Sequence, residues 1–155
     1  MKTIKKDAYK IINMKPSYTF LDHTADVLFR AQAPTVEQLF EQCALALEET
    51  QVDLSTVEQT ETITFTLENK TIERLLFDFL DELVFYKDAD QLIFNKFEIT
   101  INKHGEKYEL SCTAHGEKLD HQKHNPKVDV KAITMHMFEV SKVDQGWQAQ
   151  VLVDI

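Results

Sequence analysis

Two aspartates, Asp26 and Asp154, are the residues of this sequence whose types and positions best suit them to shared chemistry. Each lies at the edge of a strand-like segment, and only Ile155 follows Asp154. If the two strands are neighbours, both carboxylates and the terminal carboxylate of Ile155 converge, and these anionic donors require a cation or a basic side chain between them. From the residues alone a second interpretation is favoured, in which Asp26 caps a turn and Asp154 is a solvated end.

Oxygen donors of this kind favour a hard divalent cation such as calcium, magnesium or manganese, without ranking the three. Five further polar residues accompany motif-like segments and are candidates for supporting roles: His23, Asp120, His124, Lys131 and His136. Lone histidines are more often structural than liganding, and a Lys at the start of a strand is usually a solvated charge. The pair Asp22 and His23 is typical of metal-dependent phosphohydrolases, but that chemistry needs further ligands on helices, whereas His23 lies in a β-rich region.

The sequence lacks the common catalytic signatures. It has no G-x-S-x-G elbow, no G-x-x-x-x-G-K-[ST] phosphate loop and no G-x-G-x-x-G motif. Enzymes of those classes are therefore disfavoured. The formal net charge is -9 at pH 7, which opposes strong direct binding of nucleic acid, so a partner is expected to hold any RNA involved.

Cysteine usage and the N-terminal residues indicate a cytoplasmic protein. Cys43 and Cys112 lie in different apolar patterns without C-x-x-C or zinc-finger spacing, as expected of reduced core cysteines. The first residues contain several lysines but no apolar run of signal-peptide length, so no membrane segment is expected. We interpret residues 1–16 as an N-terminal accessory arm that need not be ordered, and residues 17–155 as one domain large enough to bury its own core.

Two segments have the period of amphipathic helices. Residues 35–49 begin with Thr35 and Gln38 in the spacing of a capping box, and apolar residues then recur at steps of three and four. Residues 71–86 carry a second apolar stripe, which includes Leu76, Phe79 and Leu83.

The other ordered segments read as strands. Short strands over 17–21 and 27–33 flank a polar loop, and apolar and polar residues alternate over 62–67. Two hairpins follow, 97–101 with 108–114 around Gly105, and 133–143 with 147–153 around residues 144–146, separated by a polar connection over 116–129. These elements predict an α+β fold of two layers, with two main helices packed on a largely antiparallel or mixed sheet.

Four segments together resemble the archease family: residues 23–26, residues 116–120 followed by His124, residues 130–134 with His136, and residues 154–155. The helical segment 75–83 is also similar to the family's second helix. The match covers about residues 18–155 in order, although Asp22 stands where many members carry Glu. The resemblance implies a compact domain related to strand-helix-strand-strand modules. It also implies a divalent cation site whose ligands map to Asp26, Asp154 and Ile155, with calcium the ion expected in a structure and magnesium or manganese as alternatives.

The resemblance also implies a partner. Members of the family assist an RtcB-type RNA ligase, promoting its guanylylation and multiple turnover in tRNA splicing and RNA repair. We therefore expect an accessory activator and not an enzyme. Two alternatives stay open: modulation of a tRNA methyltransferase, to which some members are linked, and a free-standing metal-dependent hydrolase that uses the same carboxylates.

Overall fold

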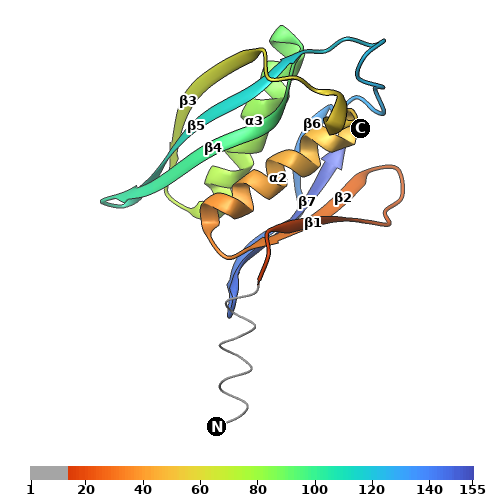
Figure 1. Cartoon of the computed structure of the whole chain (residues 1–155). Coiled ribbons are helices and arrows are strands. Elements are labelled where there is room, and N and C mark those ends of the chain that lie inside the picture. Colours follow the sequence, from red (N-terminus) through yellow and green to blue (C-terminus); the bar gives the residue numbers. More distant parts are fainter. Residues whose placement is uncertain (1–13) are drawn as a thin grey trace.

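The structure is a computed structural model that describes residues 14–155 (Figure 1). The accessory arm predicted over residues 1–16 lies almost wholly outside the described residues, so it stays a prediction. The elements are, in chain order, β1 (Ser17–Leu21), β2 (Val27–Ala33), α2 (Val36–Gln51), the 3-10 turn η1 (Leu54–Thr56), β3 (Glu61–Asn69), α3 (Ile72–Asp90), β4 (Leu92–His104), β5 (Lys107–Lys118), β6 (Ala132–Val143) and β7 (Gly146–Asp154).

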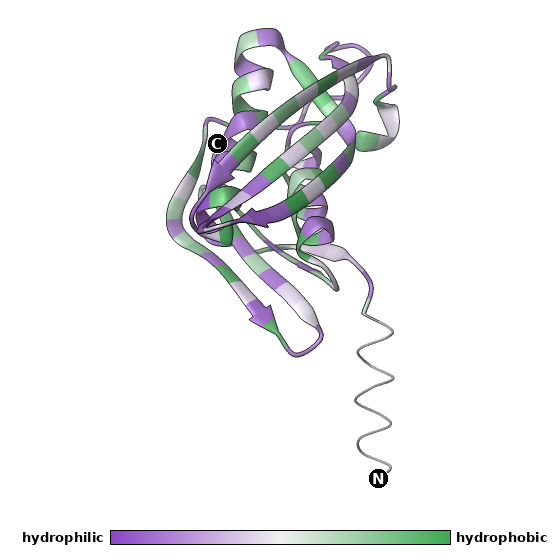
Figure 2. Cartoon of the chain, turned by 90° about the vertical axis from the view of Figure 1, so that its left-hand side faces the viewer, coloured by the Kyte–Doolittle hydropathy of each residue, from purple (hydrophilic) through white to green (hydrophobic). Residues whose placement is uncertain are grey.

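The predicted α+β class is confirmed, with two helices packed on antiparallel strands. The strands form two sheets, one with the order β1-β2-β7-β6 and one with the order β3-β5-β4. Each helix contacts both sheets, so the helices lie between them (Figure 1). The sequence pattern did not predict this division, because alternation identifies the buried face of a strand but not the strands it pairs with. Figure 2 shows the alternation as purple and green bands along the strands.

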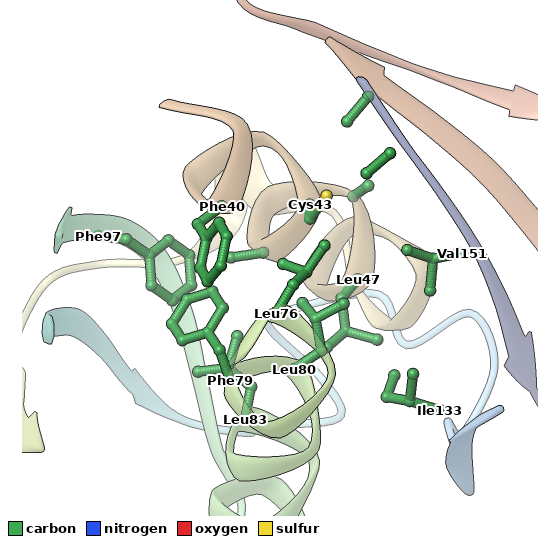
Figure 3. Packing of buried hydrophobic residues seen from close by; sticks show 14 of the residues in the cluster. Phe40, Cys43, Leu47, Leu76, Phe79, Leu80, Leu83, Phe97, Ile133 and Val151 are labelled. Atoms are coloured by element: carbon green, nitrogen blue, oxygen red, sulfur yellow. The ribbon is translucent and has the colours of Figure 1, made fainter. Parts of the chain in front are cut away.

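Helix α2 begins where the capping residues predict. The backbone N–H of Gln38 donates to Thr35 Oγ1 at 3.2 Å, which satisfies one of the free donors of the first turn. The apolar face that follows, including Phe40, Cys43 and Leu47, is fully buried between the sheets (Figure 3). The helix continues to Gln51, two residues beyond the predicted end.

Helix α3 is capped in the same way by Thr71, whose Oγ1 accepts from the Arg74 N–H at 3.1 Å. Its apolar stripe meets α2 in the core, where the rings of Phe40 and Phe79 lie 5.6 Å apart (Figure 3). The helix runs to Asp90, past the predicted end at residue 86, and stops at Gln91 in the left-handed conformation with φ 54°. No helix within residues 14–155 is long and apolar enough to cross a membrane.

Both predicted hairpins are present. Gly105 has a φ of +62° in the β4–β5 turn, a conformation that glycine adopts without steric cost. Strand β5 continues to Lys118, so the polar connection begins later than predicted, and Gly116 lies inside the strand. A Cβ atom at Gly116 would lie 1.8 Å from the carbonyl oxygen of Ile93. Glycine therefore allows β5 to approach β4 closely at this point.

Candidate functional site

The strand pairing brings the predicted acidic residues to one end of β2 and β7, the two central strands of the four-stranded sheet. Strands β2 and β7 are antiparallel neighbours, and Val27 lies opposite Val153. Asp26 immediately precedes β2 and Asp154 ends β7, so the two aspartates occupy the next position outward along this pairing. Both residues are half-buried. The condition on which the sequence argument depended, that the two strands are neighbours, is confirmed.

The loop of residues 22–26 reverses the chain between β1 and β2, and it places Asp26 at the start of β2, beside the end of β7. Ala25 has a φ of 72°, a left-handed conformation that costs an L-residue about 1–2 kcal/mol. Such conformations persist where the surrounding structure requires them, often at functional sites. His23 lies in the same loop and is exposed.

The C-terminal residues are anchored on two sides. The carbonyl oxygen of Asp154 accepts the Lys131 N–H at 2.8 Å, and Asp154 pairs with Ala132 at the start of β6. The side chain of Ile155 packs against the main hydrophobic core. The end of the chain is therefore held in position beside Asp26, whereas the Lys131 side chain is exposed.

A buried lysine that the sequence analysis missed holds the segment leading to Lys131. Lys87 Nζ lies 2.6 Å from Asp129 Oδ1, 2.8 Å from the Val130 carbonyl oxygen and 2.6 Å from Asp88 Oδ1. Burial acts to lower the pKa of Lys87, but the hydrogen bonds to Asp129 and Asp88 outweigh it and raise that pKa. Because the predicted helix ended at residue 86, Lys87 was not expected to face inward from α3.

His124 and Asp120 lie in the connection between β5 and β6 and form hydrogen bonds that hold it in place. His124 is fully buried; its Nδ1 accepts the Asp120 N–H at 2.8 Å, and its Nε2 donates to the Glu117 carboxylate. Lys123 Nζ lies 2.8 Å from Glu117 Oε1. Burial acts to raise the pKa of Glu117, but the hydrogen bonds from Lys123 and His124 lower it overall. These contacts pin the connection to β5, which gives His124 a structural role.

His136 lies in an irregular part of β6. The pairing of β6 with β7 shifts between Thr134 and Glu139, and Met137 has a φ of 59°. His136 is exposed there. The Thr134 hydroxyl donates a hydrogen bond to the carbonyl oxygen of His136 at 3.4 Å. A supporting role for the His136 side chain stays a prediction.

Comparison with known proteins identifies the family. A sequence model described as the Archease protein family (MTH1598/TM1083) matches residues 18–155. The chain belongs to the archease family. Its relatives include the protein archease of Pyrococcus abyssi, 41% identical over 135 residues that cover 86% of this chain and 95% of the relative. The protein archease of Methanosarcina barkeri is 34% identical over 139 residues, which cover 89% and 95% of the two chains.

Solved structures agree with the assignment to the archease family. The solution structure of Methanobacterium thermoautotrophicum protein 1598 is 36% identical, has a TM-score of 0.80, and is matched over 89% of this chain and 98% of that one. The Thermotoga maritima crystal structure described as "an archease, possible chaperone" is 17% identical, with a TM-score of 0.56 over 92% and 98% of the two chains. That second likeness shows the fold alone.

The donor set of this archease-family chain suits a hard cation, on the chemistry of its oxygens. Among residues 14–155, no group of three or more His, Cys, Asp or Glu side chains is gathered as a ligand set. The two predicted side-chain donors are Asp26, at the start of β2, and Asp154, at the end of β7. The third predicted donor is the main-chain carboxylate of Ile155. Carboxylate oxygens are the ligands that calcium, magnesium and manganese prefer. Binding of a cation by these donors stays a prediction.

Proposed function

We propose that this chain is an accessory protein of an RtcB-type RNA ligase that promotes guanylylation and multiple turnover of the ligase in tRNA splicing and RNA repair. In this proposal Asp26, Asp154 and the Ile155 carboxylate bind a divalent cation. The observation that carries the proposal is the pairing of Val27 with Val153 in an archease-family chain. Asp26 and Asp154 are the residues next to this pair, so the register supports a site to which both could contribute.

The residues of the chain would act by binding and orienting. A bound cation would supply positive charge for oxygen anions of the ligase or its nucleotide. The anchored Asp154 carbonyl and the packed Ile155 side chain would keep the donors in place, so that little ordering is needed on binding. An effect on the ligase requires that this protein bind one state of the ligase more tightly than another.

The charge of the chain supports a role beside an RNA enzyme and not on RNA itself. A net charge of -9 repels phosphates, so affinity for RNA would come from the ligase. The sequence also lacks a phosphate-binding loop. Nucleotide transfer and ligation would accordingly stay with the partner.

Multiple-turnover ligation by the cognate ligase tests the proposal. Wild-type protein, added in substoichiometric amounts with calcium, magnesium or manganese, should raise the number of turnovers. Asp26→Ala and Asp154→Ala should each lower stimulation by roughly 10- to 100-fold, the range that loss of a supporting metal-site group produces. Asp144→Ala, an exposed residue of the β6–β7 turn, is the matched control and should stimulate fully. Absence of stimulation by wild type, or full stimulation by both site variants, would refute the proposal.

The same proteins separate the alternatives. Phosphoester hydrolysis by the purified chain alone, lost in Asp26→Ala, would favour a free-standing hydrolase. Replacing the ligase with a tRNA methyltransferase tests the other partner, because a modulator of that enzyme would change methylation and leave ligation unaltered.

A further inference from the structure

An apolar hollow of about 370 Å³ lies beside Asp26. We call it the Phe20 hollow. Its apolar lining comes from Phe20 and Leu21 of β1, Val27 of β2 and Val128 of the β5–β6 connection. Its polar lining comes from Asp26, Glu49, Thr50 and Lys127. The hollow therefore adjoins the predicted cation site but is lined by different chemistry.

Two of the four apolar residues that line the hollow are exposed to solvent. Phe20 is 43% exposed and Val128 is 39% exposed. An exposed apolar cluster with a polar rim is typical of a protein interaction site. Phe85 is even more exposed, at 57%, but it lies on α3, outside the lining of this hollow. It provides a matched comparison.

The hollow is preformed by contacts on each side. The Phe20 ring packs edge to face against Tyr18 at 5.9 Å and Phe29 at 6.4 Å. The Tyr18 hydroxyl donates to the Glu49 carboxylate and so joins β1 to α2. On the other side, the Lys127 N–H donates to the Gln51 carbonyl oxygen at 2.8 Å. Because these contacts already hold the walls of the hollow, a partner can bind with little further ordering.

The charged residues of the lining indicate which kind of protein segment the hollow would bind. Asp26 and Glu49 are among the residues that line the hollow, and Asp22 directly follows Leu21 in the chain. The opposing cation is Lys127, whose Nζ already donates to the Glu49 carbonyl oxygen at 3.1 Å. The acidic residues around the hollow outnumber Lys127, so the lining favours basic segments over acidic ones. This preference remains when a divalent cation is bound, because the negative charge of the three predicted donor carboxylates exceeds the positive charge of the cation.

We infer that the Phe20 hollow receives an apolar side chain of the ligase, carried on a segment with Lys or Arg on either side. This inference rests on the proposed function for the identity of the partner. An apolar anchor in a preformed pocket with charge-complementary flanks is the usual form of an interface hot spot. The hollow supplies affinity for the partner, while Asp26 and Asp154 supply the cation site.

The ligation assay tests the inference through Phe20→Ser and Val128→Ser. Each substitution should raise the concentration needed for half-maximal stimulation by about tenfold or more, the loss expected when an apolar contact of this size is removed. Maximal stimulation at saturation and cation affinity by calorimetry should stay unchanged. Phe85→Ser should behave as wild type. Unchanged half-maximal concentrations for both hollow variants, with wild type active, would overturn the inference and leave the proposed function standing.

A second measurement keeps the inference testable if wild type fails to stimulate the ligase. A capped Lys-Lys-Trp-Lys-Lys peptide is titrated against the full chain and monitored by NMR. The Lys-flanked peptide should produce saturable shifts at Phe20 and Val128 that Phe20→Ser abolishes, and a Glu-flanked peptide should not. No shifts, or equal shifts with both peptides, would overturn the inference.

Two further measurements on the same protein test the other occupants that the hollow could have. If sedimentation shows a wild-type dimer that Phe20→Ser dissociates, the hollow binds a second copy and the inference is wrong. If deletion of residues 1–13 shifts the Phe20 and Val128 signals, the hollow binds the chain's own N-terminal residues, which also overturns it. A monomer with signals unchanged by the deletion supports an external partner.

Discussion

Glu48 is a fully buried carboxylic acid in the interior face of α2. Its Oε2 accepts from the Phe94 N–H at 3.3 Å and from Gln51 Nε2 at 3.4 Å, while its Oε1 has no partner. Burial raises the pKa of Glu48 from 4.5 to about 8, although the Phe94 hydrogen bond and the charge of Lys87 act in the opposite direction. The folded protein therefore holds a proton that the unfolded chain releases at neutral pH.

Replacing this acid should change how stability depends on pH. Between about pH 4.5 and 8 the native state binds the extra proton, so the free energy of unfolding falls as pH rises through this window. Glu48→Gln cannot ionise and keeps an acceptor for Phe94. It should therefore be more stable than wild type by about 1 kcal/mol or more at pH 8, and by less at pH 5.

Urea denaturation at several pH values measures the difference. Glu106→Gln, an exposed residue in the β4–β5 turn, is the control and should show no pH-dependent gain. A difference between Glu48→Gln and wild type that is the same at pH 5 and pH 8 would contradict this account.

The terminal carboxylate of Ile155 is open to an equally local test. Extending the chain by a short Gly-Ser tail converts this carboxylate into a neutral amide but leaves the Ile155 side chain against the core. The extended protein should fold normally and bind the cation roughly 10-fold more weakly or worse, since an anionic donor is lost. Calorimetry compares it with a protein carrying the same tail at the N-terminus. Equal affinities for the two would remove the terminal carboxylate from the site.

At the scale of elements, the last turn of α3 holds the connection that leads to the C-terminus. Lys87 binds Asp129 and the Val130 carbonyl, and the next residue, Lys131, donates to Asp154. Asp129 and Asp88 have exposed side chains, at 76% and 57%. Removing Lys87 would therefore leave neither carboxylate buried without a partner, and the effect should be local.

Lys87→Met should loosen the connection more than it destabilises the domain. The Lys131 amide should exchange with solvent about tenfold faster or more, because its segment loses two hydrogen bonds to Lys87, each contributing about 1–3 kcal/mol. Cation affinity should fall with it. Hydrogen exchange measured by NMR gives the comparison, with Asp88→Asn as the control that spares the Asp129 and Val130 contacts. Equal Lys131 exchange in wild type and Lys87→Met would show that the lysine does not hold this segment.

The elements also show which sequence signals sufficed. Thr35 caps α2 as its spacing with Gln38 predicted, and Gly105 identified its hairpin turn. The predicted start of the second helix at residue 71 matches its N-cap, Thr71. The end of α3 was predicted too early, because its last turn is polar and the stop is a left-handed Gln91, not the glycine or proline that usually signals one. Because of that error, Lys87 was not predicted to be a buried residue of α3.

At the scale of the whole molecule, the sequence predicted the class but not the arrangement. Alternating residues indicated strands with one buried face. No local sequence pattern, however, shows that β3, β4 and β5 form a sheet separate from the one that contains β7. The sequence left open whether Asp26 and Asp154 meet, because that depends on which strands are neighbours. The pairing of β2 with β7 meets this condition, and the cation site itself stays a prediction. The Phe20 hollow could not be predicted, because Val128 and Phe20 meet only after the connection folds across β1 and α2.

The pairing of β2 with β7 also bears on how the protein is made. Strand β7 is central in its sheet, between β2 and β6, and it follows every other described strand along the chain. Until it arrives, the β1–β2 hairpin exposes an unpaired edge of the kind that recruits other chains. Closing such a distant pairing is slow relative to local contacts. The four-stranded sheet therefore cannot form until residues 146–154 have joined it, and a chain cut before Gly146 would lack the strand around which this sheet is built.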